Sequence, residues 1–207
     1  MNRILEELST AKNDSTEESN KNVARQCIDN PELIYEIAEG FNSKNKKIVS
    51  DCIEVFTIIA ENNSELIIPF ADKIVILLTS KETKTRWEAT HTLSFIADKI
   101  PNLISSCLNI LEVIIETDKS TIVRDYSVDI ISNYSKAGKE FSEVAFKILV
   151  KVLNLWGEKH AKQALKGLNN VMFYCNEKEN EIKEIAKPYL ESTKKVVVKE
   201  AKKIMDR

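Results

Sequence analysis

The residues best suited to chemistry lie on three successive stretches of predicted helix. Trp87 and His91 are four residues apart, so they share one helix face. Asp125 and Asp129 have the same spacing, which is also that of a paired acid–base site. The other candidates, with cationic or amide side chains, are Arg124, Lys162 and Gln163. Because charged residues on a helix face are usually only solvated, we predict that these seven residues bind a partner and do not catalyse a reaction.

Motifs that would name a reaction are absent from the sequence. It has no glycine-rich phosphate loop, no GxSxG and no HExxH. The two histidines, His91 and His160, are scattered. The four cysteines are far apart with no CxxC spacing, at Cys27, Cys52, Cys107 and Cys175. We therefore predict no cofactor and no metal site, and reduced, buried thiols in a cytoplasmic protein.

Composition favours long helices joined by short polar loops. The 207 residues include only 4 Gly and 4 Pro, too few for a protein built from many tight β-turns. Apolar residues make up 43% of the chain, but no apolar run approaches the roughly 18 to 20 residues of a membrane span. The first residues lack the apolar core of a signal peptide. The composition therefore predicts an all-α protein without a membrane segment.

Two sequence elements recur along the chain. The first contains Leu33, Leu66 and Leu103, spaced 33 and 37 residues apart, and each leucine follows Asn, Ser or Pro residues that favour a helix start. The second has a small or apolar residue followed by a cation and a helical apolar stripe. Its four copies, 37 or 38 residues apart, begin at Thr85-Arg86, Val123-Arg124, Ala161-Lys162 and Val198-Lys199. One amphipathic helix cannot bury such a stripe alone, so the repeat predicts stacked helix pairs.

These elements resemble the HEAT repeat family. That family has a proline inside the first helix, an aspartate in the turn, and Val-Arg five and six residues later. Pro69 matches the first feature, and Asp118 with Val123-Arg124 matches the rest. Ser80 and Trp156 stand where the aspartate is expected in two other copies. The resemblance covers residues 30–207 and implies a right-handed α-solenoid of about five helix pairs, with a concave face that holds a protein partner.

We predict two lead-in helices and five helix pairs within a single repeat domain, 1–207. Residues 1–29 form an N-terminal cap, residues 30–175 the central repeats and residues 176–207 a basic C-terminal repeat. The lead-in helices are expected at 2–11 and 17–28. The expected pairs are 30–41 with 44–62, 64–79 with 82–99, 101–116 with 120–136, 139–156 with 158–175, and 178–191 with 194–206.

Charge is distributed unevenly along the chain. Residues 1–146 carry 16 Lys and Arg against 24 Asp and Glu, whereas residues 147–207 carry 14 against 8. The last predicted helix is rich in lysine. Its basic end would meet an acidic partner or a nucleic-acid backbone, or would simply present a solvated cap to the repeat array.

Nucleic-acid binding is the alternative function. The chain resembles, more remotely, the HEAT-like alkylpurine DNA glycosylases, whose concave face carries Trp, Asp and Arg. Trp87 matches this tryptophan and Arg124 falls on the following repeat, but His91 stands where the family has its carboxylate. Only five arginines are present, and arginine is the better reader of phosphate and bases. Arg86-Trp87-Glu88-Ala89 also resembles a segment of the HEAT-like chromophore lyases, which is too short to carry a function.

Overall fold

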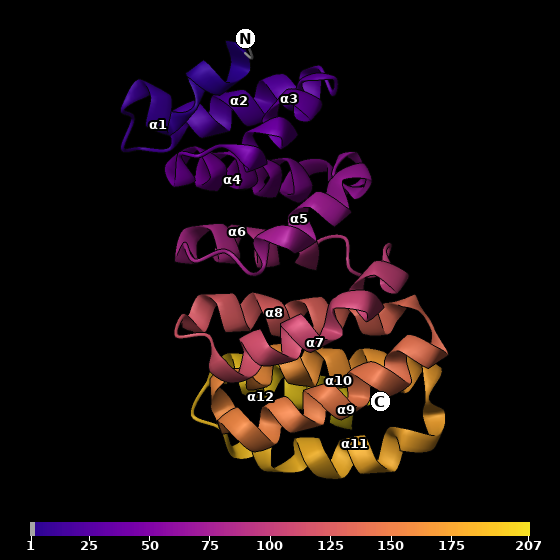
Figure 1. Cartoon of the computed structure of the whole chain (residues 1–207). Helices are drawn as coiled ribbons and strands as arrows, with labels where there is room; N and C mark the ends of the chain where they lie inside the picture. Colours follow the sequence, from indigo (N-terminus) through magenta and orange to yellow (C-terminus); the bar gives the residue numbers. More distant parts are fainter. Residues whose placement is uncertain (1–2) are drawn as a thin grey trace. The chain divides into compact units, whose positions relative to one another are not determined.

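The computed structural model describes residues 3–207 and is helical throughout that range, with no β-strand. Its α-helices are α1 (Ser9–Lys12), α2 (Glu18–Asp29), α3 (Leu33–Glu39), α4 (Lys46–Asn63), α5 (Ala71–Leu77), α6 (Thr83–Ser94), α7 (Pro101–Thr117), α8 (Thr121–Tyr134), α9 (Lys139–Trp156), α10 (Ala161–Tyr174), α11 (Glu179–Ala186) and α12 (Lys195–Met205) (Figure 1). Short 3-10 helices extend or join them at Arg3–Glu7, Gly40–Asn42, Ser64–Leu66, Ile68–Phe70, Ser135–Ala137, Gly157–Lys159, Asn176–Lys178 and Lys187–Glu191.

The predicted helix pairs are confirmed, but several helices are shorter than predicted: α3 spans Leu33–Glu39, α6 ends at Ser94 and α11 ends at Ala186. Helix α9 has the predicted bounds, and the second helices of all five pairs form as α4, α6, α8, α10 and α12. The predicted helix 64–79 is instead two 3-10 turns followed by α5, because Pro69 supplies no N–H to an α-helical ladder. The first lead-in helix is a 3-10 turn and the short α1, and its predicted start at residue 2 lies outside the described residues.

The chain divides into two compact units, unit 1 up to Ile96 and unit 2 from Ala97. Each has its own core of fully buried aliphatic side chains, such as Ile53 and Leu93 in unit 1 and Ile131 and Leu165 in unit 2. These side chains fall on the helical stripes expected from the repeat. Each unit is therefore a stack of helix pairs that buries apolar surface between neighbours.

In unit 1, helices α2, α4 and α6 pack side by side in that order (Figure 1). Short hydroxyl side chains let α4 and α6 approach closely. The Ser50 and Thr85 hydroxyl oxygens are 2.8 Å apart, and so are those of Thr57 and Thr92, with all four residues buried. Because each hydroxyl has a partner, this polar contact lies in the core without an unsatisfied group.

The lead-in segment is attached to unit 1 by polar side chains. The backbone N–H of Thr10 donates to a carboxylate oxygen of Asp51 at 2.7 Å. The Asn20 amide donates to Glu54 Oε2 at 2.9 Å, and Asn20 Oδ1 accepts from the backbone N–H of Ser9 at 2.8 Å. Two carboxylates of α4 thus fix a segment that has few apolar residues of its own.

In unit 2, helices α8, α10 and α12 form the equivalent series, and α9 packs against α10. Gly167 of α10 lies directly against Ser132 of α8. A Cβ atom on Gly167 would meet Ser132 Cα at 3.0 Å and Leu149 Cδ1 at 2.6 Å. The Asn170 amide donates to the Ser132 carbonyl oxygen at 2.8 Å. The missing side chain at position 167 therefore sets how closely the two helices approach.

The repeated arginines donate hydrogen bonds to backbone carbonyl oxygens in the turns between helices. Arg86 donates from Nη1 to the Ser80 carbonyl oxygen at 2.8 Å, and Arg124 donates from Nη1 to the Asp118 carbonyl oxygen. In each case the acceptor lies six residues earlier in the chain. The aspartate of the HEAT pattern is therefore not required for this contact, because the backbone supplies the acceptor.

No helix within residues 3–207 is both long and apolar enough to cross a membrane. All four cysteines are free thiols in buried positions.

We predict that Gly167→Ala lowers the free energy of unfolding by about 1–2 kcal/mol. The steric conflict with the Ser132 backbone costs about 1–3 kcal/mol, and the better helix propensity of alanine offsets part of it. Urea denaturation followed by circular dichroism measures the change. Lys162→Ala, at an exposed position of the same helix, should shift stability by less than about 0.5 kcal/mol. An unchanged midpoint for Gly167→Ala would show that α8 and α10 separate without cost.

Candidate functional site

The most chemically distinctive surface of unit 1 is a groove across α4, α6 and the loop before α2. It consists of two adjoining cavities, of about 370 Å³ and about 570 Å³, that share Glu17 and Lys84. Seven carboxylates but only three lysines line them. The acidic residues are Asp14, Glu17, Asp51, Glu54, Glu61, Glu82 and Glu88, and the lysines are Lys21, Lys47 and Lys84. We call this surface the acidic groove.

Trp87 lies in the acidic groove and is partly buried. Its indole nitrogen, Nε1, is covered and has no hydrogen-bond partner within the described chain. Since that nitrogen is the only polar atom of the side chain, the exposed part of Trp87 is carbon. A partly exposed aromatic surface among carboxylates suits an alkyl chain that ends in a cation.

His91 lies in the same cavity one turn further along α6. Burial lowers its pKa to about 4, so the imidazole is neutral at pH 7. Its Nε2 is 3.8 Å from a carboxylate oxygen of Glu61, and its ring lies 5.0 Å from that of Phe95 between centroids. His91 therefore adds no positive charge to the groove at neutral pH.

Two buried carboxylates set the charge of the groove floor. Glu88 follows Trp87 in the chain, and only 6% of it is accessible. Burial raises its pKa to about 7. Burial also raises the pKa of Glu54, opposed by the Lys84 ammonium 2.8 Å away. Lys84 also lies 3.4 Å from Glu17, so one lysine serves two carboxylates, and Glu88 forms no ion pair within residues 3–207.

We predict that Glu88→Gln removes a pH dependence of stability between pH 4.5 and 7. The pKa of Glu88 rises from 4.5 to about 7 on folding, so its contribution to stability is complete below pH 4.5 and is lost as the pH rises through 7. Above pH 7, the glutamine variant should therefore be more stable than the wild type, by up to about 3 kcal/mol. Urea denaturation of both proteins from pH 4.5 to 8 tests this. A stability difference that stays constant over the range would contradict it.

The other five predicted residues belong to unit 2. Arg124, which the sequence predicts to bind a partner, is instead 95% buried because its side chain extends between helices. Its Nε donates to His160 Nε2 at 3.2 Å, and its guanidinium carbon lies 4.4 Å from the Trp156 ring centroid. On the other side of the imidazole, His160 Nδ1 is 2.6 Å from Asp125 Oδ1. The two contacts together require the proton on Nδ1 and the lone pair on Nε2.

This chain of contacts gives Arg124 and Asp125 a structural role. His160, to which the sequence assigned no role, is fully buried and joins α8 to the start of α10. Its partner Asp125 is thereby already engaged and is poorly placed to act as an acid or base. The repeated cation therefore has a structural role at Arg124, where it donates to a histidine and to a carbonyl oxygen.

The remaining predicted residues keep some exposure. Asp129 is partly buried, which raises its pKa, and its Oδ1 lies 3.8 Å from Lys166 Nζ. Lys162 is exposed and Gln163 is partly exposed on α10. Of the seven predicted site residues, Trp87 and His91 share the acidic groove, and Arg124 and Asp125 share the His160 contact.

We predict that His160→Ala lowers the free energy of unfolding by about 2–4 kcal/mol. The loss follows because both Arg124 and Asp125 would be left without their buried partner. Denaturant midpoints measure the effect. His91→Ala is the matched comparison, and since this ring is partly exposed we expect a loss of about 1 kcal/mol. Equal losses for the two histidines would indicate that the contacts of His160 add no stability.

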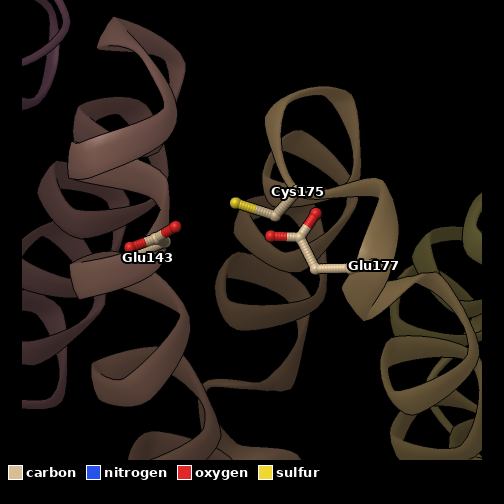
Figure 2. Close-up of side chains that lie close together, drawn as sticks. All are labelled: Glu143, Cys175 and Glu177. Carbon is tan, nitrogen blue, oxygen red and sulfur yellow. The ribbon is translucent and has the colours of Figure 1, made fainter.

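A third cluster, in unit 2, consists of Glu143, Cys175 and Glu177. One ligand atom from each side chain lies within 4.8 Å of those of the other two. Figure 2 shows the Cys175 sulfur pointing toward the helix that carries Glu143, with the Glu177 carboxylate beside it. Sequence reasoning missed this cluster, because Glu143 is 32 residues before Cys175 and becomes a neighbour only when α9 packs on α10.

Comparisons with known proteins identify the fold. No protein-family model and no curated protein matches the sequence. A designed armadillo repeat protein in complex with the peptide (KR)4 has a TM-score of 0.75 at 16% identity, with 99% of this chain and 98% of that chain covered. An archaeal HEAT-like repeats protein from Thermococcus onnurineus NA1 has a TM-score of 0.58 at 12% identity, with 91% of each chain covered. An engineered protein matches with a TM-score of 0.70 at 19% identity, and this chain spans 57% of its length.

These likenesses define the class of protein. The chain has the all-α solenoid fold of the armadillo and HEAT-like repeat proteins, as its repeat pattern predicted. At identities of 12–19% these comparisons describe the fold alone, and the function is inferred from the residues that line the surface of this chain.

Proposed function

We propose that this chain is a non-enzymatic, cytoplasmic scaffold that binds an extended, basic segment of a partner protein in the acidic groove. The observation that carries the proposal is the excess of carboxylates around Trp87. Unit 1 as a whole has 16 acidic and 11 basic residues, so its long-range field also attracts a cationic segment.

The shape of the groove suits an extended chain. Its two cavities adjoin at Glu17 and Lys84, so a bound segment has a continuous path from Lys47 to His91. Lysine and arginine side chains can lay their alkyl stems on the carbon surface of Trp87 and direct their charged ends to carboxylates. Glu61 and Glu17 are exposed and available for such contacts.

The similar designed armadillo repeat protein supports this choice of partner. That protein is in complex with the peptide (KR)4, an alternating basic sequence. A likeness of fold does not transfer the binding residues, and it is the carboxylates of this chain that favour a basic segment. The likeness adds that a stack of this kind has room for an extended peptide.

Nucleic-acid binding, the alternative from the sequence, has less support. The groove around Trp87 repels phosphate, and Arg124 is enclosed by Trp156 and His160. The basic character of the C-terminal region comes from α12, whose lysines lie on a shallow surface and include a Lys203–Glu200 pair at 2.7 Å. A solvated cap explains that surface without a ligand.

We predict that the full chain binds a labelled (KR)4 peptide and does not bind an (ED)4 peptide of equal length, as measured by fluorescence anisotropy. Added salt should weaken binding, because part of the attraction is between exposed charges. The double variant Glu17→Lys/Glu61→Lys should weaken binding at least tenfold, or about 1.4 kcal/mol. Trp87→Ala should also lower the affinity for (KR)4, because the alkyl stems of the peptide lose the carbon surface on which they pack.

The matched control is Glu32→Lys/Glu36→Lys, which makes the same change of charge at α3, outside the groove. It should retain most of the affinity. An equal loss for the control would mean that only net charge matters. Equal binding of the two peptides, or no binding of (KR)4, would overturn the proposed function. A single-stranded DNA of similar length serves as a competitor, and its displacement of (KR)4 would favour the nucleic-acid alternative.

A further inference from the structure

The cluster of Glu143, Cys175 and Glu177 combines a thiol with two carboxylates. Glu143 lies on α9, Cys175 directly follows α10, and Glu177 belongs to the next 3-10 turn. Two hydrogen bonds fix this turn, from the Cys175 N–H to the Val171 carbonyl oxygen and from the Lys178 N–H to the Cys175 carbonyl oxygen, both at 2.9 Å. The turn therefore holds Cys175 and Glu177 on the side that faces α9 (Figure 2).

Cys175 differs from an ordinary core cysteine of the same unit. Both Cys175 and Cys107 are buried, at 0% and 2% exposure. The Cys107 sulfur donates to the Ile104 carbonyl oxygen at 3.4 Å, whereas the Cys175 sulfur has no hydrogen-bond partner among residues 3–207. It points toward the helix that carries Glu143 (Figure 2), and it lies within 4.8 Å of a carboxylate oxygen of both Glu143 and Glu177. A fully buried sulfur without a hydrogen-bond partner, close to two carboxylates, is suited to binding a cation.

We propose that Glu143, Cys175 and Glu177 bind a divalent metal ion of borderline softness, such as Zn²⁺, and thereby tie α9 to the turn after α10. Zinc accepts thiolate and carboxylate ligands and uses three protein ligands with a water in its open sites. The thiol proton is released to solvent on binding, so the metal meets a thiolate. The soft thiolate among the three ligands accounts for the preference for zinc over a hard ion such as Mg²⁺, which takes oxygen ligands.

The geometry requires only small movements. Ligand atoms in a tetrahedral zinc site are about 3.5 Å apart, and the three candidate atoms now lie within 4.8 Å of one another. Glu143 and Glu177 are exposed, so their side chains can rotate toward the sulfur while the backbone stays in place. The access path for the ion is the solvent-facing side of these two carboxylates.

Lys139 is the competitor for this site. Its ammonium is 3.3 Å from a carboxylate oxygen of Glu177, and 60% of its side chain is exposed. A bound dication would displace this ammonium, which is free to move into solvent. Lys178 is engaged elsewhere, because its ammonium lies 4.2 Å from the centroid of the Phe146 ring. Removing the charge at position 139 should therefore strengthen metal binding.

We predict that the full chain binds one Co²⁺ ion per molecule, with the near-ultraviolet absorption of a thiolate–cobalt bond, and that Zn²⁺ displaces it. The titration is done in metal-free buffer with a non-thiol reductant, and calorimetry gives the zinc affinity. Cys175→Ser should abolish the absorption band, Glu143→Gln/Glu177→Gln should weaken binding at least tenfold, and Lys139→Ala should strengthen it.

The controls are matched to each ligand. Cys107→Ser removes another buried thiol of unit 2, and Glu140→Gln removes another exposed carboxylate of α9, so both should bind like the wild type. The glutamine double variant changes only exposed residues and keeps the test valid if Cys175→Ser fails to fold. The proposal would be overturned by the absence of the thiolate–cobalt band or by a zinc dissociation constant of about 1 mM or weaker. Equal binding by the ligand variants and the control variants would also overturn it.

Discussion

The close approach of neighbouring second helices is the constraint on which this structure depends. A helix pair in this fold exposes an apolar stripe that only the next pair can cover, so stability resides in the contact between repeats. In unit 1, short hydroxyl side chains such as Ser50 and Thr85 make that contact, and in unit 2 Gly167 lies against Ser132. Larger residues at these positions would separate the helices and uncover the stripes on both sides.

The same close approach determines the charge of the polar groups that lie between helices. Glu88 and Glu54 are carried into a poorly solvated position by the packing of α4 on α6, and this burial raises the pKa of each carboxyl. His160 is enclosed between α8 and α10, where Asp125 and Arg124 supply both of its hydrogen bonds. Packing thus lowers the negative charge at the floor of the groove in unit 1, and in unit 2 it gives His160 a partner at each ring nitrogen.

Much of the fold could be predicted from the sequence, because repeat spacing and helical periodicity are local signals. The ends of α9 and the series of second helices follow from them. The exposure of particular side chains did not follow. Arg124 and Glu88 lie on the polar side of their helices, but a neighbouring helix covers each of them, and its distance depends on residues about 35 positions away. Glu143 and Cys175 meet for the same non-local reason.

The arginine contacts in the turns have a consequence for how such repeats change over time. Arg86 and Arg124 bind carbonyl oxygens, which every amino acid supplies, so the residue six positions earlier can be replaced without loss of the bond. Ser80 occupies that position in one repeat and Asp118 in the other. The arginine bond therefore places no demand on the side chain at that position, but Ser80 Oγ and Asp118 Oδ1 each accept from the backbone N–H two residues later, so the position drifts only among residues that can accept this bond. Sequences of this kind can diverge beyond family recognition while their repeats continue to stack in the same way.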